Sequence, residues 1–217
     1  MIVALAGAHG QIAMRLTGLL TGSSDRVIGL IRNPDHAADL ESRGATPVVC
    51  DLEQAGVREI AAAIAGADAA VFAAGAGPGS GAERKLSMDR DGAIKLLEAC
   101  SEAGIRRLVI VSAVGAEAPP DDDDVFSVYL RAKAEADEAV MRSDREWTIL
   151  RPGRLTDDPG AGRVLVDTEP FRGEISRDDV AAVLARLVAD SRLSQRVLYV
   201  NGGPQPLDQA LEAILLR

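Results

Sequence analysis

A glycine-rich turn near the amino terminus has residue types and spacing that suit phosphate binding. The apolar segment Ile2–Ala6 runs into residues 7–13 (GAHGQIA), and a helix is expected over Gln11–Leu20. In such a turn the first glycine permits a tight bend, the second lets the backbone approach a pyrophosphate, and a small third residue allows close helix packing. Free amides at the helix start then face the anion. We predict dinucleotide contacts from Gly7, His9, Gly10, Gln11 and Ile12, the alternative being a glycine turn for another ligand.

A tyrosine and a lysine four residues apart form the second chemical group. Tyr129 and Lys133 lie in a predicted helix, Ser127–Arg142, where positions i and i+4 share one face. Lys133 is expected to hold a cofactor ribose and to lower the pKa of Tyr129 by its charge. A phenol tuned in this way can donate a proton to a carbonyl as hydride arrives. The alternative is an ordinary pair on a helix surface.

Ser112 is the third catalytic candidate, at the end of the predicted strand Arg107–Ser112. Its hydroxyl is suited to bind a substrate oxygen or a cofactor ribose, or else it satisfies backbone groups at the strand end. The predicted catalytic residues are therefore Tyr129, Lys133 and Ser112.

The end of the second predicted strand, Arg26–Ile31, indicates which coenzyme is preferred. An NAD site places an acidic residue about 20 residues beyond the glycine turn. Here the sequence reads Leu30-Ile31-Arg32-Asn33, with Asp25 before the strand and Asp35 after a proline. A guanidinium suits the 2′-phosphate of NADP. We predict NADP(H) over NAD(H), with Arg32 and Asn33 as contacts; the alternative is that Arg32 is a solvated residue.

Three further strand ends are expected to border the coenzyme. Asp51 and Leu52 flank the adenine, although Asp51 is equally suited to cap the following helix. Ala73, Ala74 and Gly75 lack bulk, so a ribose can lie against their backbone, and 75–81 is either a loop over the cofactor or a flexible connection. After the strand Trp147–Arg151, Pro152 turns the chain over the nicotinamide end. Contacts there are predicted from Pro152, Gly153 and Leu155, while Arg154 either meets an acidic substrate or is exposed.

The elements that must position these residues alternate regularly along the chain. Apolar runs without period-two alternation predict strands covered on both faces, and helical segments between them predict parallel pairing. The expected fold is an α/β, Rossmann-type doubly wound parallel sheet in one domain, 1–217, in which 151–217 supplies the last strand, helices and a cover over the substrate. The remaining expected strands are Thr46–Cys50, Ala69–Ala73 and Val197–Val200. The remaining expected helices are Pro34–Arg43, Glu53–Ala65, a long helix ending near Ala103, Arg177–Ala189 and Pro206–Leu216.

Composition excludes several classes of protein. A net charge of −9 and a pI near 4.8 argue against nucleic-acid binding, and 3% aromatic residues are too few for base stacking. No apolar run approaches a membrane span. Two cysteines suggest a reducing compartment, so a cytoplasmic protein is expected.

Four consecutive aspartates, 121–124, lack calcium-loop spacing and are expected to be a solvated loop that feeds the next helix start, with no metal bound. The expected partner is a small-molecule substrate, on a monomer or small homo-oligomer.

The order of these motifs resembles the atypical short-chain dehydrogenase/reductases of the NAD(P)H-binding, NmrA-like type, including YhfK-like proteins and, more distantly, the biliverdin reductase B/flavin reductase group. The segments that carry the resemblance are Gly7–Ala13, Leu30–Pro34, Phe72–Gly75, Val111–Gly115, Tyr129–Lys133, Thr148–Leu155, Ile175–Ala181 and Val200–Gly203. The resemblance implies a Rossmann fold that binds NADP(H) and does not imply one substrate. This chain departs from its relatives at Ala113, where a second Ser is common, and at Val114, where extended epimerases place their active Ser or Thr.

Three functions are consistent with these residues. The first is an NADPH-dependent oxidoreductase acting on a small carbonyl, quinone or flavin-like acceptor, with Tyr129 as proton donor. The second is a non-catalytic NADP(H) sensor, which needs Arg32 and the glycine turn but not Tyr129. The third is an NAD-dependent sugar epimerase or dehydratase, which the small carboxyl-terminal portion and Val114 disfavour.

Overall fold

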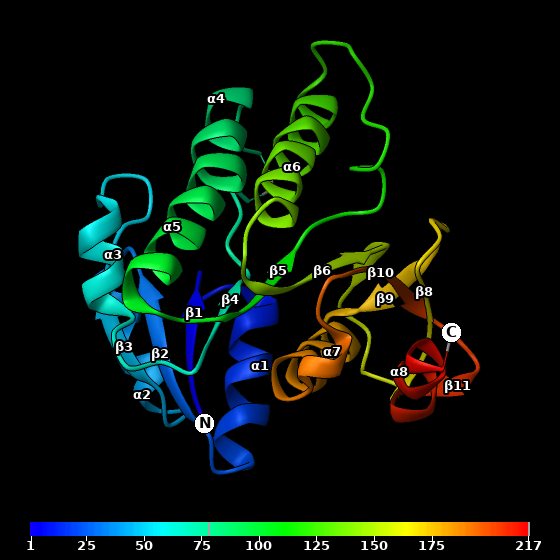
Figure 1. The fold of residues 1–217 in the computed structure, drawn as a ribbon, viewed down its shortest axis with the longest axis horizontal. Coiled ribbons are helices and arrows are strands. Elements are labelled where there is room, and N and C mark those ends of the chain that lie inside the picture. The colour runs from blue at the N-terminus through cyan, green and yellow to red at the C-terminus, as the bar shows by residue number, and fades with distance from the viewer. Residues whose placement is uncertain (78, 217) are drawn as a thin grey trace.

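Nine strands form one mostly parallel sheet in the computed structural model, which describes residues 1–77 and 79–216 (Figure 1). The strands follow the order β11-β8-β10-β6-β5-β4-β1-β2-β3, the arrangement of a Rossmann-type doubly wound sheet. The strands predicted from apolar runs are β1 (Ile2–Ala6), β2 (Arg26–Ile31), β3 (Thr46–Val49), β4 (Ala69–Phe72), β5 (Arg107–Val111), β6 (Glu146–Pro152) and β10 (Arg196–Gly202). Each of these lies within three residues of its predicted bounds, which confirms the expected fold class.

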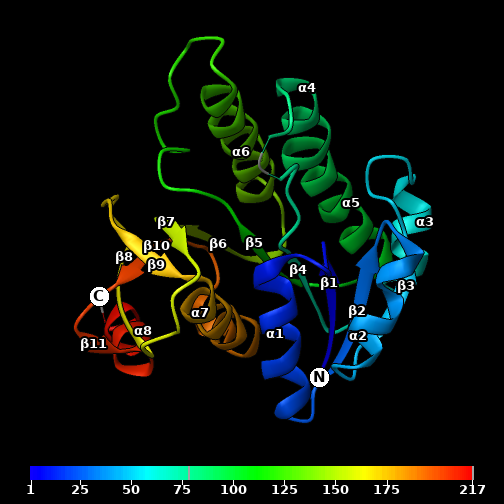
Figure 2. The same ribbon diagram turned by 180° about the vertical axis from the view of Figure 1, so that it is seen from behind.

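Helices cover both faces of the sheet (Figures 1 and 2). One face packs against α1 (Gln11–Gly22), α2 (Ala37–Glu41), α7 (Arg177–Ala189) and α8 (Leu207–Leu215). The other packs against α3 (Val57–Ala63), α5 (Ala93–Ala103), α6 (Val125–Met141) and the π-helical segment η2 (Lys85–Gly92). The short α4 (Ala82–Arg84) directly precedes η2. Two short 3-10 turns are η1 (Pro34–His36) and η3 (Ser191–Leu193).

The point where the strand order reverses lies between β1 and β4. Ala6 of β1 pairs with Leu30 of β2 and with Phe72 of β4, so these three strands end at one edge of the sheet. In open α/β sheets, ligands bind outside the carboxyl ends of the strands at such a switch point. The fold therefore brings the segments after β1, β2, β4, β5 and β6 to one edge.

The hydrophobic core is divided by the sheet into two clusters. Leu5, Leu16 and Leu184 lie in the cluster between the sheet and the α1/α7 layer. Phe72, Ile149 and Leu96 lie in the cluster on the α3/α5/α6 side. Cys50 and Cys100 are buried free thiols. Within residues 1–77 and 79–216, no helix is long and apolar enough to cross a membrane.

The carboxyl-terminal part contains strands that the sequence prediction missed. β8 (Arg163–Asp167) runs antiparallel to β10 and β11 (Gln205–Pro206), while β7 (Arg154–Thr156) and β9 (Glu174–Ser176) form a separate parallel pair. β8 alternates exposed and buried residues, the pattern of an antiparallel strand with one solvated face. Two bounds were also wrong: Pro152 is the last residue of β6 and does not stop the strand before it, and α3 begins at Val57, not Glu53.

Candidate functional site

A cleft of about 1390 Å³ opens at the carboxyl ends of the central strands. All three predicted catalytic residues line it, and so do half of the predicted cofactor contacts. Those contacts are Ile12, Ala73, Ala74, Gly75, Lys133, Pro152, Gly153 and Leu155. Gly7, His9, Gly10, Gln11, Arg32, Asn33, Asp51 and Leu52 lie outside the cleft lining, on the segments that follow β1, β2 and β3.

The glycine turn has the close backbone approach that a dinucleotide needs. Gly7 has φ +75°, and a Cβ there would lie 2.6 Å from the Cα of Ala74, so only glycine fits between β1 and β4. The N–H of Gly10 donates to the carbonyl of Gly7 at 2.8 Å, which closes the turn, and Gly10 is the N-cap of α1. The first N–H groups of a helix have no partner within it. The turn therefore presents amides toward the cleft edge without side-chain bulk, as a pyrophosphate requires.

Lys133 is held beside Tyr129 by two fixed acceptors. Its Nζ donates to the carbonyl of Val111 at 3.0 Å and lies 3.2 Å from Oδ1 of Asp89. The same Nζ is 5.8 Å from the ring centroid of Tyr129. An ammonium has three protons. Two are directed at Asp89 and Val111, so the third can be donated to another acceptor.

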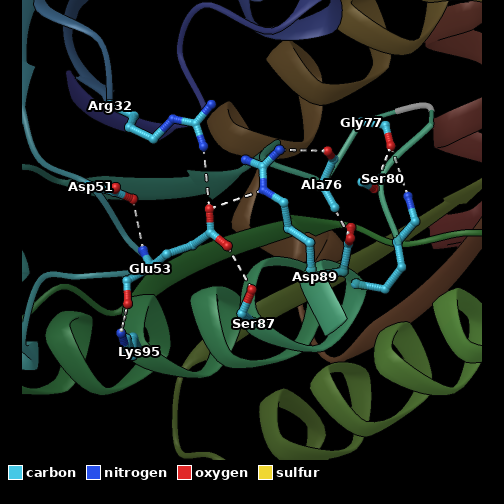
Figure 3. Close-up of polar contacts among 11 residues, drawn as sticks. Arg32, Asp51, Glu53, Ala76, Gly77, Ser80, Ser87, Asp89 and Lys95 are labelled. Atoms are coloured by element: carbon cyan, nitrogen blue, oxygen red, sulfur yellow. Dashed lines mark hydrogen bonds and ion pairs between the residues drawn. The ribbon is translucent and has the colours of Figure 1, made fainter. Parts of the chain in front are cut away.

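Asp89 is a site residue that the sequence prediction missed. It lies on η2, and its Oδ2 accepts from the N–H of Ala76 at 3.1 Å (Figure 3). It thus connects Lys133 to the loop after β4. π-helical segments often occur at functional sites, but nothing in the residue pattern of 85–92 marks one. The predicted loop 75–81 includes Pro78, which lies outside the described residues.

The pKa of Tyr129 differs from the expectation. Burial raises it, and the charge of Lys133, which acts in the lowering direction, does not compensate. The pKa of Lys133 is also raised, because Tyr129 and Asp89 outweigh the opposing effect of burial. The lowering effect predicted for the Lys133 charge is present, but burial outweighs it, so the pKa of Tyr129 is raised. The phenol is a protonated donor at neutral pH.

Ser112 faces a buried carboxylate. Its hydroxyl donates to Oδ2 of Asp137 at 2.7 Å, and the same oxygen accepts from Nε and Nη2 of Arg151 at 3.0 and 2.9 Å. Burial raises the pKa of Asp137, although Arg151 acts against it. With its proton directed at Asp137, Ser112 offers a lone pair and not a proton to a ligand in the cleft.

Arg32 and Arg84 share one acidic partner, Glu53. Figure 3 shows Arg32 directed at Glu53. Oε2 of Glu53 lies 3.4 Å from Nη1 of Arg32 and 3.2 Å from Nε of Arg84, while Oε1 accepts from Ser87 at 2.6 Å. The Arg32 side chain is 56% exposed. The Glu53 carboxylate is divided between two guanidinium groups, and the half-exposed side chain of Arg32 is accessible to a ligand.

Side-chain contacts also connect the segments that follow β1 and β2. The rings of His9 and His36 stack with centroids 3.6 Å apart, and Nε2 of His9 lies 2.8 Å from Oδ2 of Asp39. Asn33 caps the turn after β2 by accepting from the N–H of Asp35 at 3.0 Å. The stack of His9 on His36 was not anticipated from the sequence.

Asp51 does not cap the following helix, because the N-cap of α3 is Gly56. Its Oδ1 accepts from the N–H of Glu53 at 3.0 Å, which is a local turn. Lys95 fixes the same turn by donating to the carbonyls of Leu52 and Glu53, each at 3.0 Å. The adenine contact predicted for Asp51 and Leu52 stays a prediction.

The backbone at Gly153, directly after β6, packs tightly against Asn201 and Gly173. A Cβ on Gly153 would lie 1.9 Å from Oδ1 of Asn201 and 2.4 Å from the carbonyl oxygen of Gly173. The N–H of Arg154 donates to that carbonyl at 2.9 Å. Glycine at 153 therefore lets segment 171–173 close onto the cleft wall.

The four aspartates form an exposed loop that leads into α6. Oδ1 of Asp124 accepts from the N–H of Phe126 at 2.8 Å, so Asp124 is the N-cap of this helix. The prediction that this loop supplies the next helix start is confirmed. Among the described residues no group of three or more His, Cys, Asp or Glu side chains is placed to hold a metal ion.

A family model and a bacterial relative both match most of this chain. The model of the NAD(P)H-binding family matches residues 7–191. A Bacillus subtilis (strain 168) protein named "Uncharacterized sugar epimerase YhfK" is 38% identical over 215 residues, which is 99% of this chain and 100% of that protein.

Two solved structures show the same architecture. One from Bacillus halodurans, provisionally described as a NAD-dependent epimerase/dehydratase, has a TM-score of 0.92 and 34% identity and covers 99% of this chain and 100% of its own. The oxidoreductase ylbE from Lactococcus lactis has a TM-score of 0.89 and 23% identity and covers 100% of this chain and 98% of its own. At 23% identity, the similarity to ylbE shows only that the two chains share a fold.

Proposed function

Because this chain belongs to the NAD(P)H-binding family, we propose that it is an NADP(H)-dependent oxidoreductase that passes hydride to a small carbonyl, quinone or flavin-like acceptor. The observation that carries the proposal is the convergence of Tyr129, Lys133 and Ser112 on one cleft with the residues after β4 and β6. The fit of Gly7 against Ala74 supports the coenzyme, because it leaves only backbone where a pyrophosphate approaches.

The roles of the residues follow from their contacts. NADPH, when bound, supplies the hydride. Lys133, oriented by Asp89 and Val111, is suited to hold a ribose hydroxyl with its remaining proton. The Oη of Tyr129 holds a proton at neutral pH and is suited to donate it to a carbonyl oxygen of the acceptor. A quinone or flavin needs no such protein acid at the moment of hydride arrival.

The preference for NADP(H) is supported by the charges at the end of β2. Arg32 is exposed there, and its partner Glu53 is shared with Arg84. A 2′-phosphate offers Arg32 a stronger partner than a carboxylate at 3.4 Å that already pairs with Arg84. We therefore expect the added phosphate to raise affinity.

Calorimetric titration with NADPH and NADH tests this proposal. We expect NADPH to bind at least about tenfold more tightly, and Arg32→Gln to remove that difference. Arg58→Gln is the matched control, since Arg58 is 93% exposed on α3 and away from the cleft lining. If titration with NADPH and with NADH both gave no binding heat, the proposal would be contradicted. Equal affinities of the wild type for the two coenzymes would contradict the NADP preference.

Two other functions give different outcomes in the same assays. A redox sensor binds NADPH tightly, turns over no acceptor and is indifferent to Tyr129→Phe. A sugar epimerase or dehydratase is favoured by the names of two relatives. Against it, Val114 lines the cleft and supplies no hydroxyl where extended epimerases place one. NADPH oxidation across carbonyl, quinone and flavin panels separates the oxidoreductase from the sensor. Two free thiols are consistent with action in a reducing compartment such as the cytoplasm.

A further inference from the structure

The cleft has a different charge from the rest of the protein. The whole chain carries a net charge of −9. Its cleft is instead lined by five cationic and two acidic side chains: Lys85, Lys133, Arg154, Arg172, Arg177, Asp89 and Asp124. Both acids are already used, since Asp89 pairs with Lys133 and Asp124 caps α6. A cationic cleft in an acidic protein favours an anionic ligand.

Four of these five cations have partners within the protein. Lys85 donates to the carbonyl of Gly77, Lys133 pairs with Asp89, Arg154 with Glu174, and Arg177 with Asp157. Arg172 is different, because within residues 1–77 and 79–216 its side chain makes no hydrogen bond or ion pair. Its charge is therefore available to a ligand in the cleft that it lines.

The backbone on both sides of Arg172 is fixed. The carbonyl of Phe171 accepts from Nδ2 of Asn201 at 3.4 Å, and the carbonyl of Gly173 accepts from the N–H of Arg154 at 2.9 Å. Asn201 is 3% exposed and belongs to β10. Arg172 is thus an unpaired guanidinium on an anchored segment, which reduces the ordering that binding must impose.

The coenzyme phosphates are not the expected partner of Arg172. The pyrophosphate turn follows β1, and the 2′-phosphate residue Arg32 follows β2. Arg172 precedes Gly173, which packs against Gly153 directly after β6, and β6 lies three strands from β1 in the sheet order. At about 4.8 Å between neighbouring strands, that separation is on the order of 14 Å. The nearby residues 152–155 border the nicotinamide end, where the substrate must lie.

The apolar part of the cleft lining indicates the rest of the ligand. Val111, Val114, Leu130 and Leu155 line the same cleft as Tyr129. Phe126, 62% exposed at the start of α6, lies with its ring centroid 5.8 Å from that of Tyr129. Such surfaces suit a flat, largely apolar body.

We propose that the acceptor is a planar, mostly apolar molecule that carries an anionic group, and that Arg172 binds this group. The inference rests on the proposed function, since it names the substrate class for the same cleft. The anion is a carboxylate or a phosphate, both of which match a guanidinium fork.

Matched pairs of probes test the inference. Riboflavin 5′-phosphate and riboflavin differ by a phosphate, while 4-formylbenzoate and its methyl ester differ by a carboxylate charge. Each is titrated calorimetrically, and the flavins also by fluorescence, with NADP⁺ present. We expect the anionic member of at least one pair to bind about tenfold more tightly, and the responding pair identifies the anion.

Two variants decide whether Arg172 is responsible. Arg172→Gln is expected to abolish the preference without changing the affinity of the neutral probe or the melting temperature. Arg26→Gln is the control: it removes the same charge from an exposed arginine that also has no side-chain partner among the described residues, at the amino end of β2. Equal affinity within both pairs, a preference that survives Arg172→Gln, or one lost equally in Arg26→Gln would overturn the inference. Titration with NADP⁺ alone tests the proposed function separately, because coenzyme binding does not require Arg172.

Discussion

The Oδ1 of Asp89 lies 3.2 Å from the Nζ of Lys133, and the two side chains are 1% and 6% exposed. Through this pair, η2 fixes the lysine of α6 while the second carboxylate oxygen fixes Ala76 in the loop after β4. Three segments that border the cleft therefore depend on one carboxylate. Neutralising it leaves the buried Lys133 without its ion-pair partner, which is costly.

Asp89→Asn keeps the shape of the side chain and removes its charge. We expect the free energy of unfolding to fall by about 3 kcal/mol, because the buried ammonium loses its counter-ion. NADPH affinity should fall as well, since Lys133 is no longer oriented. Urea unfolding and calorimetry measure the two effects. Asp91→Asn is the control on the same helix, where a 43% exposed carboxylate pairs with Arg90 and is expected to contribute less than about 1 kcal/mol. Equal losses in the two variants would contradict this role.

Two glycine-to-alanine substitutions should have opposite effects. Gly7→Ala places a Cβ 2.6 Å from the Cα of Ala74 at a positive φ, so the turn must shift and coenzyme binding should be lost. Gly18→Ala lies inside α1 with nothing within 4 Å of the new Cβ, so it should stabilise the protein by roughly 0.5–1 kcal/mol. Melting temperature and NADPH titration report both changes. Normal coenzyme binding by Gly7→Ala would refute the assignment of the turn.

Tyr129→Phe should affect acceptors according to their chemistry. Reduction of a carbonyl should slow by about 10²-fold or more, because the proton donor is lost. Reduction of a quinone should change little. In the wild type the rate with a carbonyl should be flat from about pH 6 to about pH 9, since the pKa of Tyr129 lies above its ordinary value of about 10. Steady-state rates with both acceptor types provide the measurement; equal effects on both would argue for a structural role.

Glu53→Gln should change how stability depends on acid. Burial acts to raise the pKa of Glu53, but hydrogen bonds from Ser87 and Arg84 outweigh it and the pKa is lowered. The unfolded chain then binds the proton more readily, so the stabilisation is present above the ordinary pKa of about 4.3 and is lost as pH falls through the folded value. Urea unfolding between about pH 6 and about pH 3 should show a shallower acid loss in the variant. Glu41→Gln, at an exposed glutamate whose side chain has no partner among the described residues, should leave the slope unchanged.

The parallel strands were predictable because burial on both faces leaves a plain apolar signature. Ile2–Ala6 and Arg26–Ile31 have the bounds predicted for them. β8 was missed because it is short and lies among Asp and Gly residues, although its alternation, RVLVD, is the period-two signal of an antiparallel strand. The π-helical turns of η2 had no such signal, since tertiary packing selects them.

The candidate site was predictable where it depends on local chain geometry. The glycine turn and the Tyr129–Lys133 spacing are of this kind, and the cleft contains or borders both. The partners Asp89, Asp137 and Glu53 depend on which distant segments the fold brings together, and the sign of the Tyr129 pKa depends on how deeply it is buried. No residue spacing reports these quantities.

The tight packing of Gly153, Gly173 and Asn201 holds the segment that carries Arg172 against the end of β6. The coenzyme contacts proposed after β1, β2 and β4 belong to other segments of the chain. Under the proposed function, replacement of residues 168–172 would therefore change which acceptor binds while the proposed coenzyme contacts stay in place.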